Sequence, residues 1–117
     1  MNTVIWHNPH CSKSYETMKL LLDKGIDLTI RYYLDKPPTR EELEHVLSML
    51  DMTPYELMRR SEPVLNGKDV KDGDPGLIDL MLKHPEVIQR PIVIKDGINA
   101  KLGRPPKNVL ALFPEHE

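Results

Sequence analysis

The sequence predicts one α/β domain of three layers, in which helices pack on a mixed four-stranded sheet. Three observations predict this class. A strand, a helix and a second strand occupy the first third of the chain, a block of helices follows, and two strands with a closing helix end it. With 117 residues the chain can build one hydrophobic core and is too short for two ordinary domains. We therefore expect residues 1–117 to form a single domain.

The first strand and helix enclose the Asn8-Pro9 turn. Thr3–Trp6 is short and β-prone, which is typical of a buried strand. The helix that follows Cys11 ends at Gly25, a good residue for a helix C-terminus. Residues 28–34 then alternate in polarity, as a second strand does. The apolar face of the predicted helix carries Met18, Leu21 and Leu22. The pattern predicts a right-handed βαβ unit with two parallel strands.

A helical insertion is predicted at about residues 38–88. Thr39 and Glu42 have the spacing of a capping box, so a helix begins there after two prolines. The stretch that starts at Thr53 repeats this pattern and predicts a shorter helix that reaches Arg59 and Arg60. Residues 64–73 have no periodicity and are predicted to form a surface loop. A third helix is predicted from Asp74 to about His84.

The end of the chain predicts a hairpin and a closing helix. Ile92–Lys95 and Ile98–Lys101 are separated by Asp96-Gly97, a pair that suits a two-residue type I′ turn. After Gly103-Arg104-Pro105-Pro106, the closing helix places Val109, Leu110 and Phe113 on one side. The order βαβ, helical insertion, ββα is that of a thioredoxin-like fold.

The composition restricts the partners. Sixteen basic and eighteen acidic residues give a net charge of −2, so no overall field attracts nucleic acid or an anionic membrane. No apolar run approaches the ~18 residues of a membrane span, and the N-terminus lacks a secretory signal. The single cysteine excludes an internal disulfide. These features predict a soluble protein of a reducing compartment, the cytoplasm.

Cys11 is the candidate nucleophile. A thiol at a strand-to-helix turn can point at the free N–H groups of the first helical turn, which favour the thiolate. A lone cysteine can equally fill space as a small hydrophobe. Here Lys13 and two histidines supply possible positive charge, and no bulky apolar residue follows until Met18. We therefore interpret Cys11 as reactive.

Arginines beside prolines or at helix ends are the candidates for holding an anionic electrophile. Arg90-Pro91 directly precedes the third strand, where a thioredoxin-like fold places a cis proline, so a cis bond is expected. Arg104 begins the joint into the last helix, although an exposed arginine at a strand end is also common. Arg59 and Arg60 are adjacent, so on a helix at most one faces a pocket. Guanidiniums that converge on a thiol would bind an oxyanion and lower the thiol pKa.

Five sequence blocks in order resemble the glutaredoxin-coupled arsenate reductase family. They are His7-Asn8-Pro9-His10-Cys11-Ser12-Lys13-Ser14, Tyr33-Leu34 with Pro37 to Leu43, Leu57-Met58-Arg59, His84-Pro85 through Gln89 to Val93, and Gly103-Arg104-Pro105-Pro106.

The resemblance implies a role for each matching residue. In that family the cysteine attacks arsenate, three arginines bind the oxyanion, and glutathione with glutaredoxin supplies the reducing equivalents. Carried over by motif, these roles fall on Cys11 and on Arg59, Arg90 and Arg104, with Arg59 preferred to Arg60. Glutathione would be a co-substrate, with no bound cofactor and no metal.

Two further positions match residues that tune the thiol in the family. They are His7 and Ser14, although a loop histidine and a first-turn serine without such roles explain them equally well. Tyr15 departs from the pattern, because many members of the family carry arginine there.

Two other functions remain open. Spx-type transcription regulators share this fold and bind RNA polymerase, but they typically sense redox state through two cysteines, and position 14 here is serine. A glutathione-dependent thiol reductase would use the same Cys11 on another electrophile. The lone cysteine favours a reaction that an external thiol completes, because an internal resolving thiol needs a second cysteine.

Overall fold

The computed structural model describes residues 2–116, apart from the side chain of His116. These residues form two compact units. The first unit contains the chain up to Lys36 and from Arg90 onward, and the second unit is Pro37–Gln89. None of the helices in the described residues is long and apolar enough to cross a membrane.

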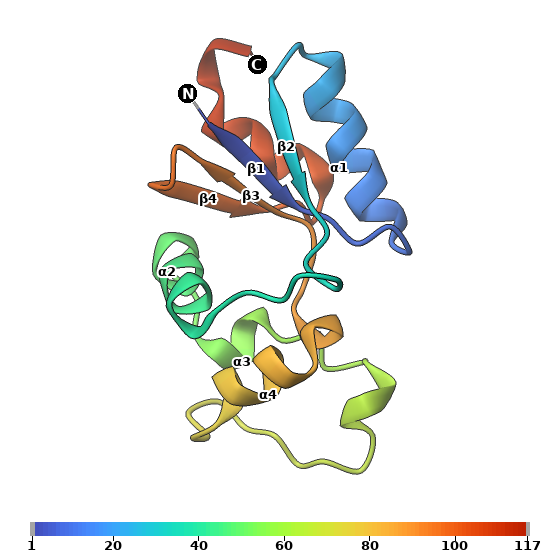
Figure 1. The fold of residues 1–117 in the computed structure, drawn as a ribbon, viewed down its shortest axis with the longest axis vertical. Helices are drawn as coiled ribbons and strands as arrows, with labels where there is room; N and C mark the ends of the chain where they lie inside the picture. The colour runs from blue at the N-terminus through green and yellow to red at the C-terminus, as the bar shows by residue number, and fades with distance from the viewer. Residues whose placement is uncertain (1, 117) are drawn as a thin grey trace. The chain divides into compact units, whose positions relative to one another are not determined.

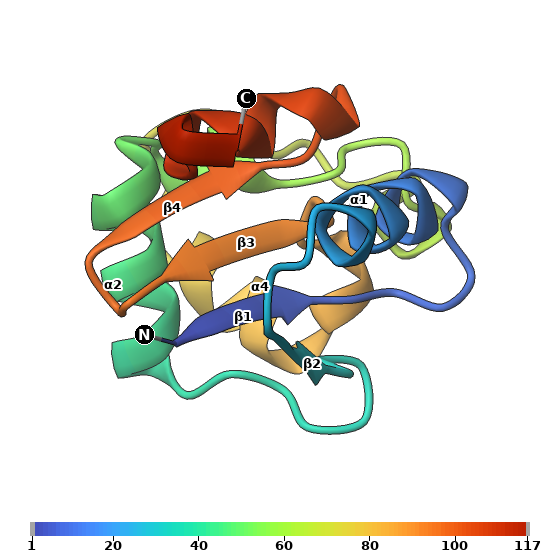
Figure 2. The ribbon, with the colours of Figure 1, turned by 90° about the horizontal axis from the view of Figure 1, so that it is seen from above.

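A mixed four-stranded sheet in the order β2-β1-β3-β4 organises the first unit (Figures 1 and 2). β1 (Thr3–Trp6) pairs in parallel with β2 (Leu28–Arg31) and antiparallel with β3 (Ile92–Lys95), which pairs antiparallel with β4 (Asn99–Leu102). The parallel pair and the hairpin are those that the sequence predicts. The fold is the expected α/β thioredoxin-like one.

β2 is shorter than the alternation of residues 28–34 predicts. It ends at Arg31 because the chain turns at Tyr32, whose carbonyl accepts the N–H groups of Asp35 and Lys36, each at 3.0 Å. Tyr33 is fully buried and stacks on Trp6, with ring centroids 6.3 Å apart. The alternation of polarity in this stretch therefore comes partly from a turn.

The helix α1 (Ser12–Asp23) ends as predicted, but its buried face is different. Gly25 takes a positive φ of 77°, and its N–H and that of Ile26 bond to the carbonyls of Leu22 and Leu21, which is a Schellman motif. The expected face included Leu22, which is 48% exposed. The buried residues are Ser14, Thr17 and Leu21. The small polar residues Ser14 and Thr17 are buried, and a prediction based on the spacing of apolar residues does not detect them.

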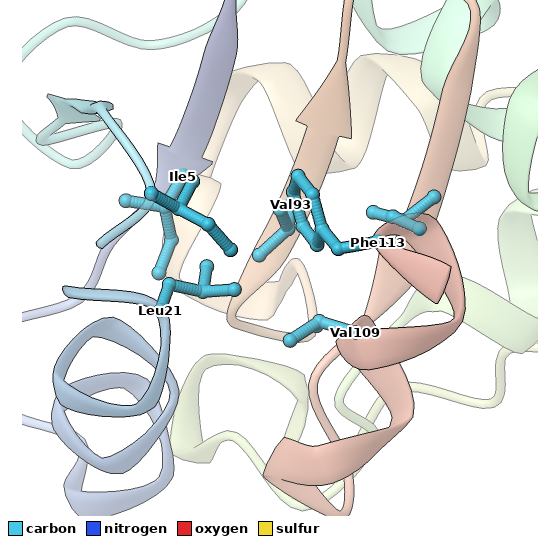
Figure 3. Packing of buried hydrophobic residues seen from close by; sticks show 7 residues of the cluster. Ile5, Leu21, Val93, Val109 and Phe113 are labelled. Carbon is cyan, nitrogen blue, oxygen red and sulfur yellow. The ribbon is translucent and has the colours of Figure 1, made fainter. Parts of the chain in front are cut away.

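The core of the first unit lies between the sheet and two helical segments, α1 and the 3₁₀ helix η3 (Pro106–Leu112) (Figure 3). Ile5 of β1 and Val93 of β3 point to the same face because they are register partners. The cluster consists of Ile5, Leu21, Ile26, Val93, Val109, Leu112 and Phe113. The closing helix was expected to bury Leu110. Val109 and Phe113 are buried as predicted, but a 3₁₀ helix aligns i with i+3, so Leu112 faces inward in place of Leu110.

The hairpin forms, but its loop has three residues instead of the predicted two. Lys95 pairs with Asn99, which leaves Asp96, Gly97 and Ile98 between the strands. Asp96 and Gly97 both have positive φ, as the Asp-Gly pair predicts, and the N–H of Ile98 donates to the Lys95 carbonyl at 3.1 Å. Ile98 is added after this turn, so β4 starts one residue later than expected.

The second unit consists mainly of α2 (Arg40–Leu50), α3 (Pro54–Leu57) and α4 (Leu77–Lys83). Both predicted capping boxes form, at Thr39 with Glu42 and at Thr53 with Glu56. α4 begins at Leu77 and not at Asp74, because Gly76 takes a positive φ of 85° directly before it. Between α3 and α4, the stretch predicted as a loop contains turns after a short 3₁₀ helix, η1 (Pro63–Leu65).

Candidate functional site

Cys11 is the N-cap residue of α1. Its backbone is extended, with φ −118° and ψ 120°, and its carbonyl accepts the N–H groups of Ser14 and Tyr15 at 3.1 and 3.2 Å. The turn before it is tight, because the N–H of Cys11 donates to the Asn8 carbonyl at 3.1 Å and the Asn8 side chain accepts the N–H of His10 at 2.8 Å. The thiol is half-buried. The turn therefore places an accessible sulfur at the amino end of the helix.

The pKa of the Cys11 thiol lies below its ordinary value. Burial is the largest single effect and raises the pKa, but it is outweighed by the sum of the others. Hydrogen bonds from the backbone N–H groups of Ser14 and Lys13 lower the pKa, and the hydrogen bond and charge of Arg90 lower it further. The position of the thiol favours the thiolate, which is the nucleophilic form.

Two arginines lie beside this sulfur in the first unit. Arg90 is buried, with 6% of its surface exposed, and its bond to Pro91 is cis, as the sequence predicts. Arg104 is exposed, and its Nη1 lies 4.0 Å from the Cys11 Sγ and 2.9 Å from the Arg90 carbonyl, to which it donates. The Arg104-Pro105 bond is also cis, which the sequence reasoning missed. The Gly-Arg-Pro-Pro block was the only sign of it.

His7 and Ser14 are buried together beneath the turn. The Ser14 hydroxyl lies 2.6 Å from His7 Nδ1 and accepts the Asn8 N–H at 3.0 Å. Burial lowers the pKa of His7 from 6.5, so the neutral imidazole predominates at pH 7. In the tautomer with an unprotonated Nδ1, the ring accepts the hydroxyl proton, and the hydroxyl oxygen still accepts the Asn8 N–H. Ser14 thus acts on the turn through its side chain and on the thiol through its backbone N–H.

Two tyrosines flank the His7 ring, and no sequence motif pointed to one of them, Tyr32. Tyr15 and Tyr32 both contact the ring in edge geometry, with centroids 4.7 and 5.7 Å from it. Each tyrosine is nearly half exposed. Tyr15 therefore packs on the histidine beneath the turn.

The remaining candidate arginines lie in the second unit, and the prediction of a helix through them is wrong. α3 ends at Leu57, because Met58 is extended and bridges Ile88, and the Arg59 N–H donates to the Val87 carbonyl at 2.6 Å. The first unit thus brings together Cys11, Arg90 and Arg104, while Arg59 belongs to the second unit.

The side chains of Arg59 and Arg60 have different surroundings. Arg60 lies over the Tyr55 ring, 4.3 Å from its centroid, and its Nη1 donates to the Tyr55 carbonyl at 2.9 Å. The Nε of Arg59 lies 3.4 Å from Ser61 Oγ and 3.6 Å from a Glu62 carboxylate oxygen. The Arg60 guanidinium is thus held against Tyr55 by stacking and by a hydrogen bond.

Comparison with known proteins gives matches along nearly the whole chain. Residues 6–112 match the model of the ArsC family. An arsenate reductase from Escherichia coli is 38% identical over 97% of this chain and 82% of its own length. An arsenate reductase from Haemophilus influenzae is 39% identical over 97% of this chain and 100% of its own. A solved arsenate reductase from Vibrio cholerae is 40% identical, with a TM-score of 0.86 over 97% of this chain and 98% of that one.

Proposed function

The chain belongs to the ArsC family, and on that premise we propose that it reduces arsenate to arsenite at Cys11. One observation carries the proposal more than any other. A thiol of lowered pKa lies at the amino end of a helix, with the Arg104 guanidinium 4.0 Å from the sulfur. A thiolate beside fixed cations suits attack on a tetrahedral oxyanion, because the cations hold its oxygens while the sulfur approaches the central atom.

The first step is nucleophilic attack on arsenic. The Cys11 thiolate forms a sulfur–arsenic bond, and one arsenate oxygen leaves as water after protonation. Arg90 and Arg104 neutralise the charge on the remaining oxygens, and guanidiniums do so at any working pH. Arg59 is proposed as the third arginine of this set, on the strength of its matching motif.

The second and third steps use external thiols. The sulfur of glutathione bonds to the Cys11 sulfur, and the sulfur–arsenic bond breaks with its electron pair left on arsenic, so arsenic(V) becomes arsenic(III) and arsenite departs. Glutaredoxin then attacks the glutathione sulfur and releases the Cys11 thiolate. The presence of one cysteine in the sequence supports this order. Such a cycle needs the reduced thiol pool of a cytoplasm.

The test is arsenite formation with purified protein, glutathione and glutaredoxin. Wild type is expected to turn over, while Cys11→Ser is expected to show only the background rate. Absence of turnover by wild type, or equal turnover by the serine variant, would contradict the proposal. Activity on a glutathionylated peptide but not on arsenate would favour a thiol reductase instead.

The reactivity of the Cys11 thiol distinguishes an arsenate reductase from a non-enzymatic binding module. Alkylation of Cys11 is expected to be slowed by arsenate, because an oxyanion held by the arginines would cover the sulfur. A thiol of ordinary pKa that arsenate leaves unprotected would favour the binding module.

A further inference from the structure

The segment Gly103-Arg104 is held to Arg90-Pro91 by two hydrogen bonds. The N–H of Gly103 donates to the Pro91 carbonyl at 2.9 Å, and Nη1 of Arg104 donates to the Arg90 carbonyl at 2.9 Å. The same Nη1 lies 4.0 Å from the Cys11 sulfur. The place of the Arg104 guanidinium therefore depends on how closely Gly103 approaches the chain at Pro91.

Gly103 is buried and has no room for a side chain. A Cβ at this position would lie 2.6 Å from the Thr17 Oγ1 and 2.7 Å from the Pro91 Cγ, well inside van der Waals contact. The other five glycines all have positive φ, and a Cβ on any of them would meet nothing within 4 Å. Gly103 is thus required for close packing, whereas the others serve backbone conformation.

Thr17 forms the opposite wall of this contact. It is fully buried on α1, and its hydroxyl donates to the Lys13 carbonyl at 2.8 Å. Lys13 belongs to the first turn of the helix that begins after Cys11. Thr17 therefore contacts Gly103 on one side and bonds to the first helical turn beside the thiol on the other.

We propose that Gly103 and Thr17 are positioning residues, whose contact fixes the Arg104 guanidinium beside the Cys11 sulfur. Neither residue needs to touch the substrate. A Cβ at position 103 would push the segment away from α1 and Pro91, and both hydrogen bonds that hold Arg104 would lengthen. The inference rests on the proposed function only in treating the Cys11–Arg104 pair as an oxyanion site.

The test measures local positive charge at the sulfur without any substrate. Cys11 is alkylated with anionic iodoacetate and, separately, with neutral iodoacetamide, and the ratio of the two rates reports a cation beside the thiolate. Gly103→Ala is expected to lower this ratio as far as Arg104→Ala does. In the Arg104→Ala background, Gly103→Ala is expected to change the ratio no further, because the two changes act through one side chain.

A matched control separates positioning from general destabilisation. Gly25→Ala strains a positive φ of 77° and meets no atom within 4 Å, so it lowers stability at the end of α1 opposite to Cys11. It is expected to leave the ratio unchanged. If Gly103→Ala does not fold, Thr17→Ala tests the same contact by opening it, and a lower ratio is again expected. An unchanged ratio in either folded variant, or an additive effect in the Arg104→Ala background, would overturn the proposal.

The second readout uses arsenate and separates this inference from the proposed function. Gly103→Ala is expected to weaken protection of Cys11 by arsenate about tenfold or more, since a small misplacement of a binding group has effects of that order. If wild type shows no protection at all, the proposed function fails. The alkylation ratio would still test the positioning role.

Discussion

The charge of Arg90 has a specific consequence for the thiol it contacts. Arg90 is buried, and both its hydrogen bond and its charge lower the pKa of Cys11. A charge in a partly buried setting is weakly screened by solvent, so its removal has a larger effect than removal of an exposed lysine. The effect of Arg90 on the pKa of Cys11 should therefore be large enough to measure with a single substitution.

Arg90→Gln is expected to raise the thiol pKa, because glutamine keeps a hydrogen-bond donor and loses the charge. The measurement is the pH dependence of iodoacetamide alkylation, with the chain's one thiol as the only target. Lys13→Gln removes an exposed charge from the first turn of α1 and is the control, which is expected to shift the curve less. A curve for Arg90→Gln that coincides with wild type would contradict the assigned role.

The buried His7 predicts a pH dependence of stability. Its pKa in the folded chain is lowered from 6.5 by burial, so the unfolded chain binds the proton more readily. Stability is therefore full above pH 6.5 and decreases as the pH falls toward the folded-state pKa. Urea unfolding of His7→Gln at pH 7.5 and 5.5 is expected to show a smaller loss than wild type. His10→Gln, a change at an exposed histidine, is expected to keep the wild-type loss.

At the scale of elements, the first turn of α1 acts on the thiol through its backbone. The N–H groups of Ser14 and Lys13 lower the pKa of Cys11, and the helix places them there because Cys11 is its N-cap. A proline in the first turn of a helix removes one N–H at modest cost to the helix.

Lys13→Pro, compared with Lys13→Ala, isolates that N–H from the charge of the side chain. Both variants lose the ammonium group, and only proline loses the donor. The proline variant is expected to have the higher thiol pKa, measured by the same alkylation curve. Equal values in the two variants would mean that the Lys13 N–H contributes nothing.

The sequence predicts correctly those parts of helices and turns that depend on residues adjacent in the chain. The two capping boxes, the Gly25 helix end and the positive φ values of Asp96-Gly97 all follow from a few adjacent residues. The inner face of α1 was misjudged because Thr17, a polar residue, packs against Gly103, 86 positions later in the sequence. The end of α3 was misjudged for a similar reason, because Met58 bridges Ile88.

At the scale of the whole molecule, the candidate site draws on separate parts of the sequence. Cys11, Arg90 and Arg104 could each be proposed from motifs, but the distance of 4.0 Å between Arg104 and the sulfur depends on tertiary structure. The cis Arg90-Pro91 bond was predicted from the fold class and the second cis bond was not. Arg59 lies in the other unit, so its role needs an experiment that reads out function.

Arg59→Gln and Arg60→Gln form a matched pair for that experiment. Loss of a charged hydrogen bond costs about 1.5–3 kcal/mol, so Arg59→Gln is expected to lower kcat/KM for arsenate by about tenfold to a hundredfold. Arg60→Gln is expected to have little effect, because that side chain is stacked on Tyr55. The reverse result would assign the third arginine to position 60.

The solitary thiol also determines how the protein responds to oxidants. Its pKa is lowered and it is half-exposed, which are the properties that make a cysteine sensitive to peroxide. Peroxide converts such a thiolate to sulfenic acid, and the sequence contains no second cysteine to trap this acid as an internal disulfide. The acid must meet an external thiol or proceed to the irreversible sulfinic acid. The same small thiol that would regenerate Cys11 in the proposed reaction would therefore also protect it from permanent inactivation.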